Sequence, residues 1–375
     1  MNKVEKSVFI FLLLLGVILA GCSATSNAGV DKKSEKEPVS KVKNKDLQAD
    51  ENKEEADKKT AVQYYFTANE EGSISKIDAA NNSIVTTIEL DGSVHNVQVS
   101  PDGKMIGATV MPSMAGHGGG DVGHGEKMEM GAKAVFYSIE SNKLIQEVEV
   151  GNHPAHLVFS EDGKYAAITN NEDSSVTFID MPSFNVVNTV ETGKGPHGFR
   201  ISSVSKRAYI ANMGEDTVSV VNLENMKEEK RIKVGTAPVT TGVTSDGKTL
   251  VATLNGENAL AVVDLATDKV DKIPVGTGPA QVYIDGKDQF AYVANQGTEE
   301  TPSSSVTVID LAAKKATTEI KTGKGSHGVV TSPDNKMVYV TNMFEDTVSI
   351  IDKELNKVIE TIEVKGVPNG ISITN

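Results

Sequence analysis

The feature that most constrains this 375-residue chain is a unit that recurs along most of its length. Each unit opens with a glycine, often as Gly-x-x-Pro, and continues with an alternating stretch, a tight Ser-Pro-Asp-Gly-Lys-like turn and three further β-rich stretches. Four of the six intervals between the opening glycines are 41–43 residues. These glycines are Gly92, Gly151, Gly193, Gly235, Gly276, Gly323 and Gly366. A repeat of this length with four short strands is typical of a propeller blade.

The two ends of the repeat predict how the fold closes. The β-rich stretches alternate with period two and are rich in Val, Ile, Thr and Tyr, which predicts strands. The repeat starts with a second-type strand near residues 63–69 and ends with a first-type strand at residues 370–373. A propeller completes its last blade so that no long strand edge stays open. We therefore predict an all-β fold: a single seven-bladed β-propeller of four-stranded blades over residues 61–375, closed by pairing of the C-terminal strand with the N-terminal blade.

The second strand of most units ends in a short aromatic or aliphatic motif followed by Asn. Five examples are Tyr65-Phe66-Thr67-Ala68-Asn69, Ala167-Ile168-Thr169-Asn170, Tyr209-Ile210-Ala211-Asn212, Tyr292-Val293-Ala294-Asn295 and Tyr339-Val340-Thr341-Asn342. The pattern resembles the YVTN-repeat β-propeller family over about residues 63–375. The resemblance implies the propeller fold. It implies no single activity, because relatives include surface proteins, lipoproteins and domains similar to the haem-d1 propeller of nitrite reductase, and no catalytic residue is carried over.

The first residues have the pattern of an export signal. Lys3 and Lys6 precede an apolar run over residues 8–20, and Leu19-Ala20-Gly21-Cys22 follows. The run is shorter than the ~20 residues of a comfortable membrane span. The last four residues resemble a lipobox, in which the cysteine is lipidated and becomes the mature N-terminus; the alternative is an ordinary secretory signal. We predict a lipoprotein signal peptide at residues 1–21 and a protein anchored by lipid on the extracytoplasmic face of a cell membrane.

Residues 22–60 are predicted to be the lipidated Cys22 followed by a disordered charged tether. Residues 31–60 contain nine Lys and nine Asp or Glu, with almost no large apolar side chains, so they cannot bury enough surface to offset the entropy of ordering. Cys22 is the one cysteine of the chain, so an intramolecular disulfide is excluded. The chain carries a net charge of −14, nearly all of it in the repeats, which argues against nucleic acid as a partner.

Histidine and methionine occur together in three of the seven blades. Aligned on the turn lysine, three blades have a histidine just inside the first strand and a methionine sixteen residues later, and the other four have neither. The pairs are His95 with Met111, His197 with Met213, and His327 with Met343. The two residues of a pair are expected near each other at the open end of a hairpin whose first strand lines the channel. Imidazole and thioether ligands favour copper over magnesium or calcium. His153 and His156 are weaker candidates, because they break this pattern.

A long loop in blade two carries more residues of the same kind. The segment from Met111 to Ala134 is 18 residues longer than its counterpart in blade four and is rich in glycine. It contains Met114, His117, His124, Met128 and Met130. Short His-rich tracts commonly bind metal. We predict that this loop gathers metal beside the channel histidines.

These features predict a membrane-anchored, extracytoplasmic β-propeller that binds a metal ion, copper being favoured, on a His/Met-rich top face. The top face is the side that carries the opening glycines and the acidic loops between second and third strands. Two alternatives stay open: a cell-surface scaffold that binds a protein partner without metal, or an enzyme similar to the propeller lactonases and lyases. No Ser/His/Asp arrangement with recognisable spacing is present.

Overall fold

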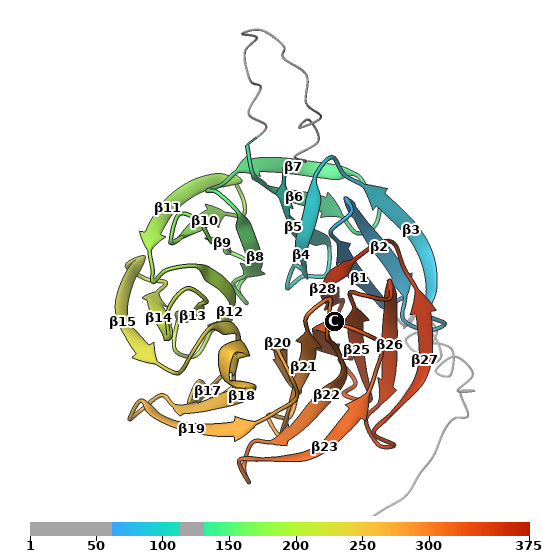
Figure 1. The fold of residues 1–375 in the computed structure, drawn as a ribbon. Coiled ribbons are helices and arrows are strands. Elements are labelled where there is room, and N and C mark those ends of the chain that lie inside the picture. Colours follow the sequence, from blue (N-terminus) through green and yellow to red (C-terminus); the bar gives the residue numbers. More distant parts are fainter. Residues whose placement is uncertain (1–61, 113–130) are drawn as a thin grey trace, which may run out of the picture. The chain divides into compact units, whose positions relative to one another are not determined.

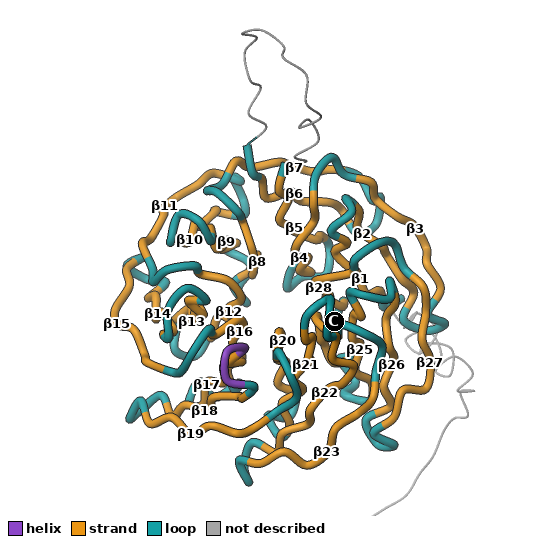
Figure 2. Tube along the Cα trace, in the orientation of Figure 1, coloured by secondary structure: helices purple, strands orange, loops and turns teal. Residues whose placement is uncertain are grey.

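A computed structural model describes residues 62–112 and 131–375. These residues form seven four-stranded antiparallel sheets, arranged as blades around a common axis (Figures 1 and 2). The predicted all-β, seven-bladed propeller is confirmed. Within the described ranges there is one short helix, the 3-10 turn η1 (Asn255–Glu257), and no helix long and apolar enough to cross a membrane.

Each blade runs from an inner strand to an outer strand, and blades are numbered here in chain order. Blade one contains β28 (Pro368–Ile373), β1 (Tyr64–Asn69), β2 (Ser73–Asp78) and β3 (Ser83–Glu89). Blade two contains β4 (Ser93–Val99), β5 (Met105–Met111), β6 (Lys133–Ser138) and β7 (Leu144–Glu149). Blade three contains β8 (Pro154–Phe159), β9 (Tyr165–Asn170), β10 (Ser175–Asp180) and β11 (Asn185–Glu191). Blade four contains β12 (Pro196–Ser202), β13 (Arg207–Asn212), β14 (Thr217–Asn222) and β15 (Lys227–Lys233).

The remaining three blades follow the same order around the ring. Blade five contains β16 (Pro238–Val243), β17 (Thr249–Leu254), β18 (Ala259–Asp264) and β19 (Lys269–Pro274). Blade six contains β20 (Pro279–Ile284), β21 (Phe290–Gly297), β22 (Pro302–Asp310) and β23 (Lys315–Lys321). Blade seven contains β24 (Ser326–Thr331), β25 (Met337–Asn342), β26 (Thr347–Asp352) and β27 (Lys357–Glu363).

The ring closes as the sequence predicts. The C-terminal strand β28 pairs antiparallel with β1, with Tyr65 opposite Ile373 and Asn69 opposite Pro368. The strand begins at Pro368, two residues before the predicted start. Ile371 and Ile373 join the apolar cluster between blades one and seven. The closing strand therefore contributes to the core as well as covering a sheet edge.

The opening glycine and the second-strand asparagine pack against each other in blades three, four, six and seven. Asn212, at the end of β13, donates hydrogen bonds to Thr217 Oγ1 and Ser219 Oγ of the next strand, both at 2.9 Å. A Cβ atom added at Gly193 would overlap the Asn212 side chain. The same close approach joins Gly323 to Asn342 in blade seven. Only glycine leaves room for the asparagine that ties the second strand to the third, which explains why the two residues recur together.

Apolar side chains fill the spaces between adjacent blades. In the cluster between blades four and five, Tyr209 and Val220 pack with Leu250, Ala252 and others. The second strands are almost fully buried, whereas outermost strands such as β15, with sequence KEEKRIK, are mostly exposed. Charged, exposed outer strands protect the edge of each sheet from pairing with another chain. Burial thus increases from the rim of the ring toward its inner strands.

The inner strands carry an irregularity near their first residues. In blades two, three and four, the pairing with the second strand shifts register between Val94 and Asn96, between Pro154 and Leu157, and between Pro196 and Phe199. Such a β-bulge adds a residue on one strand and redirects the side chains beside it. Strict period-two alternation therefore fails at the top of the inner strands, where the candidate ligands lie.

Candidate metal centre

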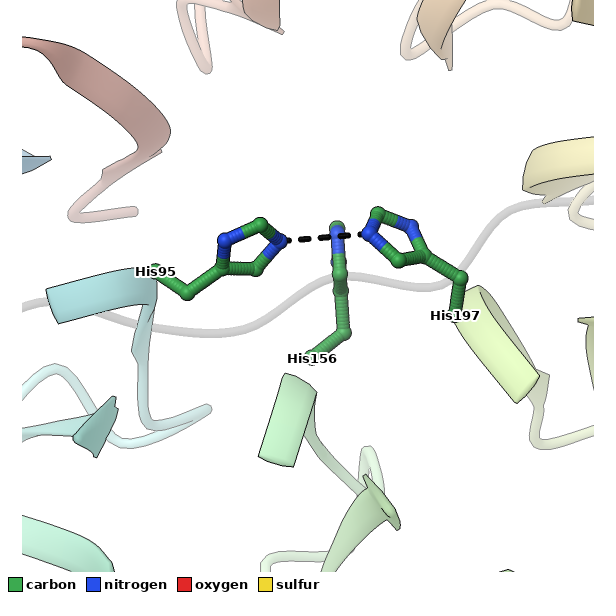
Figure 3. Close-up of side chains that lie close together, drawn as sticks. All are labelled: His95, His156 and His197. Carbon is green, nitrogen blue, oxygen red and sulfur yellow. Dashed lines mark hydrogen bonds between the residues drawn. The ribbon is translucent and has the colours of Figure 1, made fainter. Parts of the chain in front are cut away.

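Three histidines from consecutive blades meet at the top of the inner strands (Figure 3). His95 lies on β4, His156 on β8 and His197 on β12. One ring nitrogen from each lies within 4.8 Å of the other two, and the Nε2 atoms of His95 and His197 are 3.2 Å apart. Nitrogens bound to one metal at about 2.0 Å lie roughly 3–4 Å from one another. The His95–His197 pair already has this spacing, and His156 reaches it with a modest side-chain movement.

The partners of the two closest histidines determine which ring nitrogen is free. His95 Nδ1 lies 3.1 Å from Glu70 Oε1, and His197 Nδ1 lies 3.3 Å from the carbonyl oxygen of Val239. The carbonyl oxygen can only accept, so His197 Nδ1 donates, and in a neutral ring its Nε2 then has its lone pair free. His95 Nδ1 also lies 3.1 Å from the side-chain nitrogen of Asn369, which donates to Glu70 Oε1. In the His95 tautomer that donates from Nδ1 to Glu70, two lone pairs face each other across 3.2 Å. Either a proton or a metal cation between them is needed to make this contact favourable.

His156 approaches the same space from the blade between them. It is only 1% exposed, and its buried Nε2 has no hydrogen-bond partner among the described residues. Its Nδ1 lies 3.4 Å from the side-chain nitrogen of Asn96. Metal binding through Nε2 puts the ring proton on Nδ1 and breaks this hydrogen bond, which is long and therefore weak. A buried polar atom without a partner is destabilising. A metal bound through Nε2 would satisfy it.

The surroundings keep the rings of His156 and His197 neutral. Burial, followed by the nearby charges of His95 and His327, lowers the pKa of His197 to about 3. Burial and the charges of His197 and His95 also hold the pKa of His156 well below its usual value. Neutral imidazole is the form that binds a metal, so protons compete weakly at these two positions.

Glu70, which follows β1, orients the group from blade one. Burial raises the pKa of its carboxyl, but the hydrogen bond and charge of His95, followed by the Asn369 amide, outweigh burial and lower that pKa to about 2. Glu70 is therefore a carboxylate that accepts from His95 Nδ1. A carboxylate behind a ligand histidine fixes its tautomer and aims the other nitrogen at the metal. In the sequence Glu70 is one of several acidic residues in the loops between second and third strands, and the repeat pattern does not distinguish it from the others.

The structure differs from the predicted trio in one member. His95 and His197 come together as expected, but His156 rather than His327 completes the group. His327 lies on β24 in blade seven, with its Nδ1 3.4 Å from both Gln281 Nε2 and the carbonyl oxygen of Asn369. Seven blades cannot supply threefold symmetry, and the three grouped histidines instead occupy neighbouring blades on one side of the axis.

The bulge explains why sequence alignment ranked His156 too low. In the aligned repeats His156 lies one position after His95 and His197, where strict alternation would turn its side chain away. The bulge that β8 shares with β4 and β12 lets two consecutive residues of an inner strand face the channel, so His156 at the second position reaches the same space as His95 and His197 at the first. His153, the other lower-ranked histidine, lies at a positive φ of 51° outside the strand and contacts Glu172. Two histidines in Pro-Ala-His and Pro-His sequences at the same strand start are the signal that could have suggested the correct group.

The three paired methionines surround the site without belonging to the histidine group. Met111 lies opposite Ser93, and therefore diagonally across the hairpin from His95. The backbone of Met213 bonds to Gly195, two residues before His197, and its side chain is 42% exposed. Met343 is buried, and its sulfur accepts a hydrogen bond from Gln296 at 3.2 Å. Met343 therefore already has a polar partner, whereas Met213 faces solvent.

The remaining predicted residues lie outside the described ranges. These are the lipidation candidate Cys22 and the loop residues Met114, His117, His124, Met128 and Met130.

Comparison with known proteins agrees with the fold. A family model described as a YNCE-like beta-propeller matches residues 139–375. No curated protein matches the chain in sequence. Among solved structures, hydrazine synthase of Kuenenia stuttgartiensis is similar at 19% identity with a TM-score of 0.64, covering 76% of this chain and 90% of its own. A functionally unknown protein of Desulfotomaculum acetoxidans is 12% identical with a TM-score of 0.69, and the match covers 83% of this chain and 99% of that protein. A dihydro-heme d1 dehydrogenase is 14% identical with a TM-score of 0.59, and the match covers 81% of this chain and 64% of that protein.

Proposed function

This chain belongs to the YNCE-like β-propeller family, and we propose that it binds a copper ion through His95, His156 and His197 at the top of its inner strands. The observation that carries the proposal is the 3.2 Å separation between the Nε2 atoms of His95 and His197, whose Nδ1 atoms lie beside Glu70 and the Val239 carbonyl. A metal cation between these nitrogens forms a coordinate bond to each. A ring nitrogen of His156 lies within 4.8 Å of both, and the buried Nε2 of His156 has no hydrogen-bond partner among the described residues.

Copper is favoured over other metals by the whole set of nearby residues. Three imidazoles alone suit zinc, copper, iron and nickel. Thioethers select Cu(I), and three methionines follow the inner-strand histidines in the aligned repeats. The loop after Met111 adds further methionines and histidines, although its residues 113–130 lie outside the described ranges. In this proposal the loop captures copper, and the histidine group holds it.

We also propose that Cys22 carries a lipid that anchors the protein on the extracytoplasmic face of a membrane. The support is the lipobox-like Leu19-Ala20-Gly21-Cys22 after a short apolar run. Cys22→Ser is expected to move the protein from the membrane fraction to the soluble exported fraction. Radiolabelled palmitate should be incorporated into the wild type alone. If the variant stays wholly in the membrane fraction, lipidation of Cys22 does not anchor the protein.

The test of copper binding uses the full-length chain, purified in mild detergent without a polyhistidine tag and stripped with a chelator. Cu(I) is titrated against a chromophoric Cu(I) chelator, and Zn(II) and Cu(II) are titrated separately. We expect one tightly bound Cu(I) per chain and weaker Zn(II) binding. X-ray absorption of the loaded protein should show nitrogen neighbours at ~2 Å.

His153→Asn is the matched control, because it removes an exposed histidine of the same face while keeping a residue that tolerates positive φ. It should bind copper as the wild type does. Equal loss of copper in this control and in His197→Ala would show that binding is nonspecific. A wild type that binds no metal would overturn the proposal, and the facing Nε2 atoms would then share a proton.

A further inference from the structure

A second group of channel-facing residues lies below the histidines. Three residues after the first histidine position of each repeat, the inner strands carry a second ring of side chains. Six of its members line one cavity of about 620 Å³: Gln98, Val158, Arg200, Tyr283, Val330 and Ser372. The seventh position is Gly242. Three residues of extended strand place this ring roughly 10 Å from the histidine group.

Arg200 is the one charged member of this ring, and it lacks an acidic partner. It lies on β12, the same strand as His197. One guanidinium nitrogen, Nη1, donates to the carbonyl oxygen of Phe199 at 3.0 Å. No carboxylate within residues 62–112 and 131–375 lies within 4.0 Å of the guanidinium, whereas Asp285, next to the cavity residue Gly286, pairs with Lys353 at 2.9 Å. An arginine with most of its five donors unused is poised to receive a planar anion.

The position of Arg200 is held by its neighbours along the ring. Gly242, in the next blade, has no side chain, so the Arg200 side chain has room to extend past blade five. Arg200 and Gly242 line the same pocket. The guanidinium carbon then lies 5.7 Å from the centre of the Tyr283 ring, two blades away. Burial lowers the pKa of Arg200, but an arginine side chain stays cationic at neutral pH. A partly desolvated cation without a counter-charge gains stability when an anion binds.

We propose that this cavity binds a small organic carboxylate, with its carboxylate paired to Arg200 and its apolar body against Tyr283, Val158 and Val330. The apolar wall distinguishes this ligand from inorganic phosphate, which would leave those side chains without contacts. Gln98 Nε2 donates to Ser372 Oγ at 3.2 Å, which leaves the Ser372 hydroxyl hydrogen as a further donor on the cavity wall. Glu161, an exposed residue of the turn after β8, also lines the cavity and limits its affinity by repulsion.

Calorimetric titration of the full-length chain with sodium acetate, butyrate, benzoate and succinate tests this site, at constant ionic strength set with chloride. Butyrate and benzoate should bind more tightly than acetate, because they cover the apolar wall. Arg200→Gln should weaken benzoate binding at least about tenfold, since it removes a charged, two-point contact. Glu161→Gln should strengthen it about two- to threefold by removing repulsion.

Arg207→Gln is the control, because it removes an exposed arginine of the same blade that is already paired with Glu229. It should bind benzoate as the wild type does, and equal weakening in both arginine variants would overturn the proposal. Tighter binding of inorganic phosphate than of any carboxylate would overturn the assigned ligand class. Failure of the whole carboxylate series to bind the wild type would overturn the site itself.

One measurement does not depend on whether Arg200→Gln folds. A wild-type crystal soaked with 4-bromobenzoate should give a bromine anomalous peak in the cavity, and a peak only elsewhere contradicts the proposal. Copper binding should be unchanged by Arg200→Gln, so failure of the anion site and failure of the copper site give different results.

Discussion

The same seven inner strands present two unlike rings at different depths. At the top, histidines of blades two, three and four face one another, and each brings a ring nitrogen to the same space. Three residues below the first histidine position, a single arginine faces aromatic, aliphatic and hydroxyl side chains. The upper ring supplies electron-pair donors for a cation, and the lower ring supplies a cation for an anion. On β12 one strand contributes to both, through His197 and Arg200.

The comparison shows how a repeat fold separates architecture from chemistry. Blade formation depends on the recurring Gly–Asn contact and on the apolar clusters between blades. The Gly–Asn contact involves none of the channel-facing positions, and only some of them, such as Val158 and Val330, belong to the apolar clusters. The others can therefore differ from blade to blade. Propellers can therefore place unrelated binding groups a short distance apart on one rigid ring.

Removing β28 should break both rings and have the largest effect. Deletion of residues 368–375 removes Asn369 from the top and Ser372 from the lower ring, and it opens an edge on β1. Burial of Ile371 and Ile373 is lost as well. We expect a fall in Tm of roughly 10 °C or more, together with a tendency to aggregate, measured by calorimetry and light scattering. A truncated protein with the wild-type Tm would contradict closure by this strand.

Replacing His95, His156 and His197 by Ala should abolish the upper site alone. We expect Cu(I) affinity to fall at least about a hundredfold, because all three nitrogen ligands are removed. Benzoate binding should not change, since Arg200 and the cavity stay in place. His327→Ala should lower copper affinity much less than His156→Ala does. The reverse order would restore the grouping predicted by the aligned repeats.

Glu70→Ala should weaken the upper site without removing a ligand. Loss of the partner of His95 Nδ1 leaves the ring free to turn and to change tautomer, and such changes typically cost about 10- to 100-fold in metal affinity. Glu70→Gln, which keeps an oxygen acceptor, should recover part of the loss. A purely structural role for Glu70 would lower Tm in both variants and leave the affinity unchanged; the titration separates the two roles.

Acid should lower the folding stability of the protein mainly through the buried histidines of the upper ring, and less through the lower ring that contains Arg200. The pKa of His197 is lowered to about 3 and that of His327 to about 4, mainly by burial, whereas unfolded histidine titrates near ~6.5. Below ~6.5 the unfolded chain therefore binds protons that the folded protein does not. The stability that these groups contribute is complete above ~6.5 and is lost progressively as pH falls toward 4.

Calorimetry of metal-free protein at pH 7.5 and pH 5.0 measures this effect, the smallest of the four. The wild-type Tm should fall by a few degrees, and the fall should be smaller in His197→Ala, which has no buried ring to protonate there. Arg200→Gln, with no group that titrates in this range, should show the wild-type difference. A larger fall in His197→Ala would contradict the assigned sign.

Much of the fold could be predicted from particular recurring residues, and less of the site could. The opening glycines predicted the blade number because they recur at the blade period, and in four blades the glycine contacts the second-strand asparagine in the same way. The alignment also identified His95 and His197, since these two equivalent residues of the repeat do lie close together in the structure. It assigned the third place to His327 because alignment treats equal positions as equivalent, although blade seven and blades two to four face different parts of the channel.

Sequence alone determined the seven-bladed architecture and its closure by the last strand. The reason is that the alternation of apolar residues and the turn residues are local features, and they recur from repeat to repeat. Only the tertiary structure decided that His156 joins His95 and His197, that Glu70 fixes one of them, and that Arg200 stands without an acidic partner in its ring. The first depends on a bulge, shared by the three inner strands, that lets two consecutive residues face the channel, and the others depend on distances between blades. Such contacts join positions far apart in the chain, and no repeat pattern contains them.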